Sequence, residues 1–86
     1  MENTAAQTVK DRLIVITVNR KNVKMQEHRP TGREIKEAAI QQGVQIQLDF
    51  QLSEKVEKKF KPIADEERVN IDNGDEFRAV AGDDNS

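Results

Sequence analysis

Cysteine is absent from the 86-residue sequence, which contains one histidine, two prolines and only three aromatic residues. Without cysteine, the chain can form no disulfide, thiolate nucleophile or zinc–cysteine site, and it suits a reducing compartment. The single histidine, His28, has no serine or carboxylate beside it in a recognisable catalytic pattern, so we expect a turn residue there. We therefore expect a protein that is not an enzyme and that holds no metal or other cofactor.

Long apolar segments are missing as well. No run approaches the ~18 apolar residues that span a bilayer, and residues 1–10 lack the apolar stretch of a signal peptide. These absences predict a cytoplasmic protein with no membrane contact. The length fits one compact domain with a small core, because a chain of this size buries only a modest share of its surface.

Charge is abundant but unevenly distributed. Residues 1–61 carry 12 basic and 8 acidic side chains, a net +4, whereas residues 62–86 carry 2 basic and 8 acidic ones, a net −6. This asymmetry favours an interaction surface or tail over nucleic-acid binding, which needs a concentrated basic face. The lysines of segment 55–61 are interrupted by Glu57 and preceded by Glu54, so we expect a solvated loop there.

A hairpin is predicted near the N-terminus. Residues 13–18 are β-branched and largely apolar on both faces, which favours a central strand. Residues 19–22 supply turn chemistry, because asparagine tolerates a positive φ and bonds to its own backbone. Residues 23–26 can then return as a shorter strand, with Val23 and Met25 pointing inward.

The next segment carries the start signal of a helix. Thr31 can cap the backbone N–H three residues on, while the Glu34 side chain reaches back to the backbone of Thr31. Three apolar residues follow at the spacing of one helical face: Ile35, Ala38 and Ala39. Gly43 supplies the left-handed residue that ends a helix. The sequence therefore predicts a helix over residues 32–42, with Thr31 and Glu34 in a structural role.

The second half predicts shorter elements. Strict alternation over residues 46–52 indicates a strand, and residues 53–59 are too charged for the core and indicate a loop. Residues 60–63 fit a short edge strand, where proline is tolerated. Two residues of the following segment are expected to point inward: Val69 and Ile71. The acidic segment 72–76 lacks the full ligand spacing of a calcium loop, so we interpret it as a turn before a last strand over residues 77–81.

This order of elements indicates an α+β fold, the β-grasp, with one main helix across a four- to five-stranded mixed sheet. The first strand needs two neighbours, which the return strand and a parallel last strand provide. A ferredoxin-like sandwich would need a second helix after the third strand, and residues 53–59 are a poor candidate. We expect a disordered segment 1–11, a domain 12–81 and a flexible acidic tail 82–86.

Several segments together resemble bacterial multiubiquitin-type domains, which are ubiquitin-like, over roughly residues 13–80. The segments are ITVNRK at 16–21, PTGREI at 30–35, Pro62-Ile63, Asp65-Glu66-Glu67, Val69-x-Ile71 and Gly74-Asp75-x-Phe77. The resemblance implies a ubiquitin-like modifier whose partners are an activating enzyme, a conjugating enzyme and a deubiquitinase-like metallopeptidase, in systems with a role in phage defence. This chain departs from the family pattern in having one such domain and no terminal Gly-Gly.

The resemblance also implies that the C-terminal carboxylate is adenylated, passed to an enzyme cysteine as a thioester and joined to a target amine by an isopeptide bond. Residues resembling a recognised tail are Arg78, Ala79, Val80 and Ala81. We hypothesise that a peptidase cuts between Gly82 and Asp83, removes residues 83–86 and exposes Gly82. In the other interpretation, Gly82 merely ends the strand and the acidic end aids solubility.

Partner docking is expected on the sheet face away from the helix. Either residues 14, 16 and 18 or Leu13 and Val15 point to that face, and Thr17 favours the second set. Two other functions keep the same fold. One is a non-covalent adaptor, whose tail is never activated. The other is a sulfur carrier with a terminal thiocarboxylate, which the missing Gly-Gly disfavours unless the chain is processed.

Overall fold

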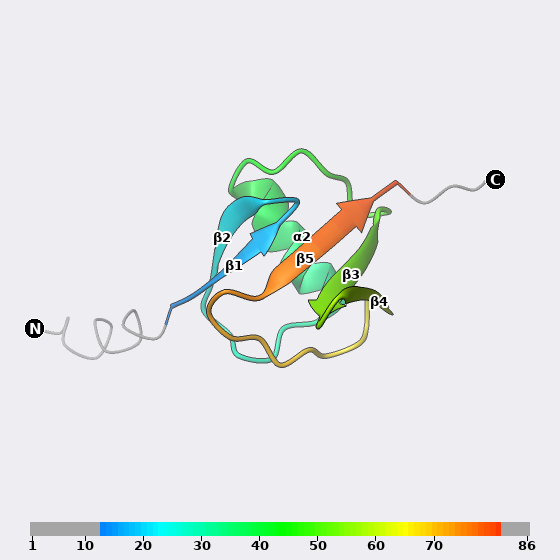
Figure 1. Ribbon diagram of the computed structural model, residues 1–86. Coiled ribbons are helices and arrows are strands. Elements are labelled where there is room, and N and C mark those ends of the chain that lie inside the picture. The colour runs from blue at the N-terminus through cyan, green and yellow to red at the C-terminus, as the bar shows by residue number, and fades with distance from the viewer. Residues whose placement is uncertain (1–12, 82–86) are drawn as a thin grey trace, which may run out of the picture.

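A computed structural model of the chain describes residues 13–81 (Figure 1). Within them the elements are β1 (Ile14–Val18), β2 (Lys21–Met25), α2 (Gly32–Gln41), β3 (Gln51–Val56), β4 (Lys59–Ile63) and β5 (Glu76–Val80). The five strands form one sheet in the order β2-β1-β5-β3-β4, and α2 lies across one face of it (Figure 1). This is the predicted β-grasp arrangement. The predicted segments 1–11 and 82–86 lie outside the described residues.

The central prediction, that the first and last strands run side by side, is confirmed. β1 pairs in parallel with β5, with Thr17 opposite Glu76 and Val18 opposite Phe77. β2 flanks β1 on its other side, antiparallel, and both predicted inward residues of β2 are buried. β5 therefore occupies the middle of the sheet, because β3 pairs antiparallel with its other edge.

The two faces of β1 divide as predicted. The helix-facing side chains are almost fully buried: Ile14, Ile16 and Val18. Val15 and Thr17 alternate with them and are half-buried on the outer face, and Leu13, the residue before β1, is half-buried as well. The remaining core comes from all the other elements and the loops between them: Val23, Met25, Ile35, Ala39, Val44, Ile46, Leu52, Ile63, Val69, Ile71, Phe77 and Ala79.

The turn between β1 and β2 consists of Asn19 and Arg20, which follow the last β1 residue and precede the first of β2. Their φ angles are 53° and 70°. Two positive φ angles in a two-residue turn match the right-handed twist of the strands, which makes this the favoured kind of hairpin turn. Asparagine adopts this conformation at little cost, so Asn19 is well suited to its place.

The predicted capping box at the start of α2 is present. The Glu34 N–H donates to Thr31 Oγ1 at 3.1 Å, and the Thr31 N–H donates to Glu34 Oε1 at 2.9 Å. The helix ends one residue before the predicted end, followed by Gly43 at φ 99°. Gly32 begins the helix where another segment approaches closely, and a side chain there would overlap the Ala64 carbonyl oxygen.

The predicted strand over residues 46–52 is wrong. Residues 44–50 form a loop, β3 begins at Gln51, and the predicted loop 53–59 is mostly strand and a tight turn. The alternation of apolar and polar residues did not indicate a strand here, because the loop buries Ile46 but leaves Leu48 37% exposed. The charged residues form strands because the β3–β4 hairpin lies at the sheet edge, where few side chains need to enter the core. The predicted edge strand over residues 60–63 is confirmed as part of β4.

A buried lysine in α2 explains what holds that loop. Lys36 is 2% exposed, and its Nζ donates to the carbonyl oxygens of Leu48 at 2.6 Å and Phe50 at 2.8 Å. The same atom lies 2.7 Å from Asp65 Oδ1. Three acceptors match the three donors of an ammonium group, so the buried charge is fully paired. Lys36 thus ties the helix to two loops without regular structure of their own.

Among residues 13–81 no helix combines the length and apolar character needed to cross a membrane.

Candidate functional site

The residues predicted to form a recognised tail lie mostly inside the folded sheet. Arg78, Ala79 and Val80 belong to β5, and Ala79 is 2% exposed. Ala81 follows the strand and is exposed. Gly82 and Asp83, predicted as the processing site, lie outside the described residues. A segment that threads into another protein can therefore begin no earlier than Ala81 without unpairing β5.

β5 presents alternate side chains to the two faces of the sheet. Phe77 and Ala79 point into the core, whereas Glu76, Arg78 and Val80 are exposed on the outer face. β3 holds one edge of the strand up to its last residue, with Gln51 opposite Val80. The strand is thus paired with β3 from Phe77 to Val80.

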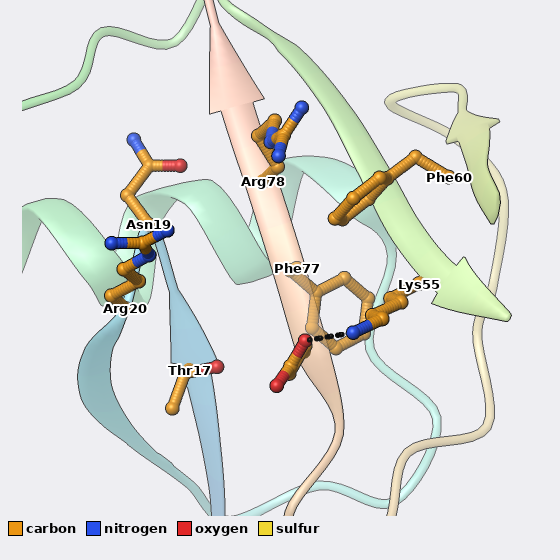
Figure 2. A pocket seen from close by; sticks show the side chains of 8 residues that line it. Thr17, Asn19, Arg20, Lys55, Phe60, Phe77 and Arg78 are labelled. Carbon is orange, nitrogen blue, oxygen red and sulfur yellow. Dashed lines mark ion pairs between the residues drawn. The ribbon is translucent and has the colours of Figure 1, made fainter. Parts of the chain in front are cut away.

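A hollow of about 670 Å³ lies on the outer face around β5 (Figure 2). Its lining residues come from β1, the turn after it, β3, β4 and β5: Thr17, Asn19, Arg20, Lys55, Phe60, Glu76, Phe77 and Arg78. Three cationic side chains and one carboxylate line it, so its net charge is positive. It therefore suits an anionic or mixed polar and apolar ligand better than a purely apolar one.

Two side-chain contacts shape the hollow. The Arg78 guanidinium carbon lies 4.1 Å from the centre of the Phe60 ring, a cation–π contact worth about 0.5–1 kcal/mol at an exposed site. Lys55 Nζ lies 3.2 Å from Glu76 Oε1, but both side chains are about half exposed, so this pair stabilises little. Within residues 13–81, Arg20 and Arg78 have no carboxylate partner. Their charges are therefore available to a ligand.

Apolar side chains flank the hollow on the same face. Val80 of β5 is 48% exposed, and Phe60, which lines the hollow, is 36% exposed. Val15 of β1 is half-buried. The outward set on β1 is the one predicted from sequence. The contribution of Phe60 and Arg78 was missed, because they lie 18 residues apart in the sequence and meet only through the pairing of β5, β3 and β4. A partner role for this face remains a prediction.

Asn19 connects the β1–β2 turn to the end of β5. Its Nδ2 donates to the Ala79 carbonyl oxygen at 2.9 Å, and the Ala79 N–H donates to Asn19 Oδ1 at 2.8 Å. The Asn19 backbone N–H also donates to the Phe77 carbonyl oxygen at 3.0 Å. Sequence reasoning identified Asn19 only as a turn residue, because its partner is 60 residues away.

The titratable groups offer little chemistry of their own. Burial raises the pKa of Glu54, and the nearby Asp75 carboxylate raises it further, while Lys61 partly offsets both. His28 lies in an exposed bend, and its carbonyl oxygen accepts from the Ile71 N–H at 3.0 Å. Segment 72–76 forms the predicted turn, with the Asp72 N–H donating to Asp75 Oδ2 at 2.9 Å. Across residues 13–81, no three His, Cys, Asp or Glu side chains gather in a metal-binding arrangement.

A capped helix across a mixed five-stranded sheet, with the first and last strands parallel and adjacent, defines a ubiquitin-like β-grasp domain. The chain belongs to the multiubiquitin family, whose sequence pattern matches residues 14–83. This match covers every strand and the helix. No curated protein and no solved structure matches the sequence significantly.

Proposed function

We propose that this protein is a ubiquitin-like modifier, joined through its C-terminal carboxylate to an amine of a target protein. The observation that carries the proposal is the position of β5. The strand is held in the middle of the sheet, ends at Val80, and is followed by an exposed Ala81 with no further element in the described part of the chain. A carboxylate a few residues beyond a rigid body can reach a remote active site while the body docks elsewhere.

The covalent chemistry belongs to partner enzymes. The carboxylate attacks the α-phosphorus of ATP, forms an acyl adenylate and releases pyrophosphate. A cysteine thiolate of the activating enzyme then displaces AMP to give a thioester. After transfer to a conjugating enzyme, a target amine displaces the thiolate and forms the isopeptide bond. The modifier itself supplies the carboxylate and the docking surface, and needs no catalytic residue or cofactor.

Processing by a metallopeptidase is the second part of the proposal. Cleavage after Gly82 removes residues 83–86 and leaves a small residue at the terminus, which suits a narrow enzyme channel because glycine has no side chain. The multiubiquitin resemblance supports a bacterial, cytoplasmic setting and a role in phage defence.

A non-covalent adaptor is the second candidate function, and the outer sheet face favours it. The hollow combines Arg20 and Arg78, which have no acidic partner among residues 13–81, with the part-exposed Phe60 ring, and such mixed surfaces recognise partners without covalent chemistry. A sulfur carrier would use the same tail with a thiocarboxylate at its end, and no feature of the described residues favours that chemistry over an isopeptide bond.

The test is formation of an enzyme thioester. The full chain and a chain ending at Gly82 are each incubated with an activating enzyme of a multiubiquitin-type system, with and without ATP. We expect an ATP-dependent adduct with the chain ending at Gly82, and its loss on adding a thiol reductant. Failure of both chains to form an adduct would contradict the modifier function and favour the adaptor.

Processing is tested separately by intact mass after co-expression with a deubiquitinase-like metallopeptidase of a multiubiquitin-type system. A loss equal to residues 83–86 is expected. A chain that keeps its full mass would contradict cleavage after Gly82, and a chain with Gly82→Arg serves as the matched control that should resist the peptidase.

A further inference from the structure

The parallel ladder between β1 and β5 stops before β5 does. The backbone N–H groups of Thr17 and Asn19 donate to the carbonyl oxygens of Asp75 and Phe77, at 2.9 and 3.0 Å. A straight continuation of β1 would place its next backbone groups opposite Ala79. The chain instead turns at Asn19 and Arg20 and returns as β2. The side-chain amide of Asn19, in place of β1 backbone, hydrogen-bonds to both the N–H and the carbonyl oxygen of Ala79.

The bonds to Asn19 matter because Ala79 is buried. Only 2% of this residue is exposed, so water cannot easily replace a lost partner of its N–H or carbonyl group. The neighbouring residues of β5 pair with β3, and this pairing continues to Val80. Asn19 is therefore the group that holds the end of β5 on its β1 side.

Position 19 needs a residue that tolerates a positive φ and whose side chain can also donate and accept a hydrogen bond. Its φ of 53° favours glycine, asparagine, aspartate or histidine. Of these, asparagine alone carries a donor and an acceptor on one short planar amide. Glycine would satisfy the turn but leave Ala79 unpaired, and aspartate would offer no donor to the Ala79 carbonyl oxygen.

We propose that Asn19 is a positioning residue for the C-terminal segment, because its amide clamps Ala79 and sets the boundary between folded body and tail at Val80. The importance of this boundary for conjugation rests on the proposed modifier function. Without the clamp, only the pairing with β3 holds Ala79 and Val80, so this end of β5 detaches more often and each detachment moves the tail origin by about 7 Å, at roughly 3.5 Å per extended residue. An enzyme that docks the body on one surface and reads the carboxylate at another depends on that length.

Amide hydrogen exchange of the full chain tests the clamp directly. Asn19→Gly keeps the turn conformation and the backbone bond to Phe77, so the variant folds. We expect Ala79 to exchange at least about tenfold faster than in the wild type, the effect of losing a buried hydrogen bond at the end of a strand. The Val69 amide, which donates to the Pro30 carbonyl oxygen far from the turn, should change much less and reports global stability.

Arg20→Gly is the matched control. It introduces glycine at the other positive-φ residue of the same turn, which makes no hydrogen bond to β5. Exchange at Ala79 should stay at the wild-type rate in this variant. Equal protection of Ala79 in Asn19→Gly and in the wild type would overturn the proposal, and so would equal loss of protection in both glycine variants.

Proteolysis gives a second readout that needs no conjugation enzyme. An elastase-type protease cuts after small residues, so intact mass should show cleavage after Ala81 in the wild type and in Arg20→Gly. In Asn19→Gly, cleavage should extend to the bonds after Ala79 and Val80. Identical cleavage sites in all three chains would overturn the proposal. Hydrogen exchange and proteolysis do not depend on thioester formation, so the clamp and the modifier function can each be contradicted without the other.

Where the thioester forms, kinetics separate positioning from a general structural defect. A displaced carboxylate with an intact docking surface lowers kcat for thioester formation and leaves KM near the wild-type value. We expect this split for Asn19→Gly in a chain ending at Gly82. An unchanged kcat, or a change confined to KM, would show that Asn19 does not position the tail.

Discussion

The two halves of the sheet are built on different principles. β1 and β5 lie in the middle, and every helix-facing side chain of β1 is buried. The β3–β4 hairpin lies at one edge, with only Leu52 and Ile63 fully buried, with Glu54 and Lys55 in β3 and two lysines in β4. The central half is held by the core, whereas the edge hairpin is held by backbone pairing and offers charged and aromatic side chains to the outer face.

Sequence patterns predict the central strands well, and they predict the edge hairpin and the loop before it poorly. The hydrophobic runs of the central strands, the Thr31–Glu34 cap and the turn residues are local signals, and the structure confirms the elements built from them. The secondary structure predicted for residues 46–59 was wrong because contacts with residues distant in sequence determine their conformation. The loop keeps its course because Lys36 binds its carbonyl groups, and the hairpin tolerates charge because it lies at an edge.

The candidate site shows the same limit. The outward set on β1 follows from alternation alone. The contact between Arg78 and Phe60 shapes the hollow, and the hydrogen bonds between Asn19 and Ala79 hold the end of β5. No local pattern in the sequence predicts either pair. The sequence predicted a last strand over residues 77–81, which β5 confirms, but it also likened Arg78, Ala79 and Val80 to a recognised tail, and in the structure β3 and Asn19 hold these residues in the sheet.

The sharpest way to break this comparison is to remove apolar volume from each half. Ile16→Ala, at a fully buried position of β1, should lower the free energy of unfolding by about 3–4 kcal/mol through lost burial and a cavity. Val56→Ala, at a position of β3 that is 46% exposed, should cost less than about 0.5 kcal/mol. Urea unfolding of both variants measures this. Similar losses in the two would contradict the division into core-held and edge regions.

Lys36 is a buried charge on α2 that bonds the loop leading into β3. Lys36→Met fills the space but leaves the Leu48 and Phe50 carbonyl groups without their donor, so we expect a loss of about 2–3 kcal/mol. Lys24→Met, at an exposed position of β2, is the control and should change stability by no more than about 0.5 kcal/mol. If both substitutions prove equally neutral by chemical denaturation, the three-acceptor cage does not stabilise the fold.

The turns of the two hairpins differ in how well their residues suit a positive φ. Glu57 adopts φ 60° in the β3–β4 turn, which is strained for a non-glycine residue. Glu57→Gly should relieve this strain and raise stability by about 0.5–1 kcal/mol after the larger entropy of the unfolded chain is allowed for. Lys58→Gly, next to it and without a positive φ, should show no gain. Thermal unfolding compares the two, and a lower Tm for Glu57→Gly than for Lys58→Gly would be the contrary result.

The smallest expected effect is the pH dependence of the stability that Glu54 of β3 contributes. The raised pKa of Glu54 means that the folded state binds its proton more tightly than the unfolded state does. Stability contributed by this group is therefore present at pH values below its ordinary pKa of 4.5 and is lost as the pH rises through the folded pKa. Solvent screens this part-buried side chain, so we expect Glu54→Gln to gain only a few tenths of a kcal/mol at pH 7.

That gain should disappear at pH values below 4.5, where the carboxyl group is protonated in both states. Glu66→Gln, on an exposed loop, serves as the control for removing one negative charge. Denaturant titrations of both variants at the two pH values decide the question, and a Glu54→Gln effect that persists unchanged in acid would refute this role for burial.

Everything argued for the tail depends on β5 lying beside β1 in the same direction. NOEs from the backbone amide protons of β1 measure this pairing directly. Parallel strands place the Thr17 amide proton near Asp75 and Glu76 and the Asn19 amide proton near Phe77, so both contacts should advance together along the two strands. Contacts in the reverse order, with Asn19 near Asp75 and Thr17 near Phe77, or no contacts between the strands, would contradict the account.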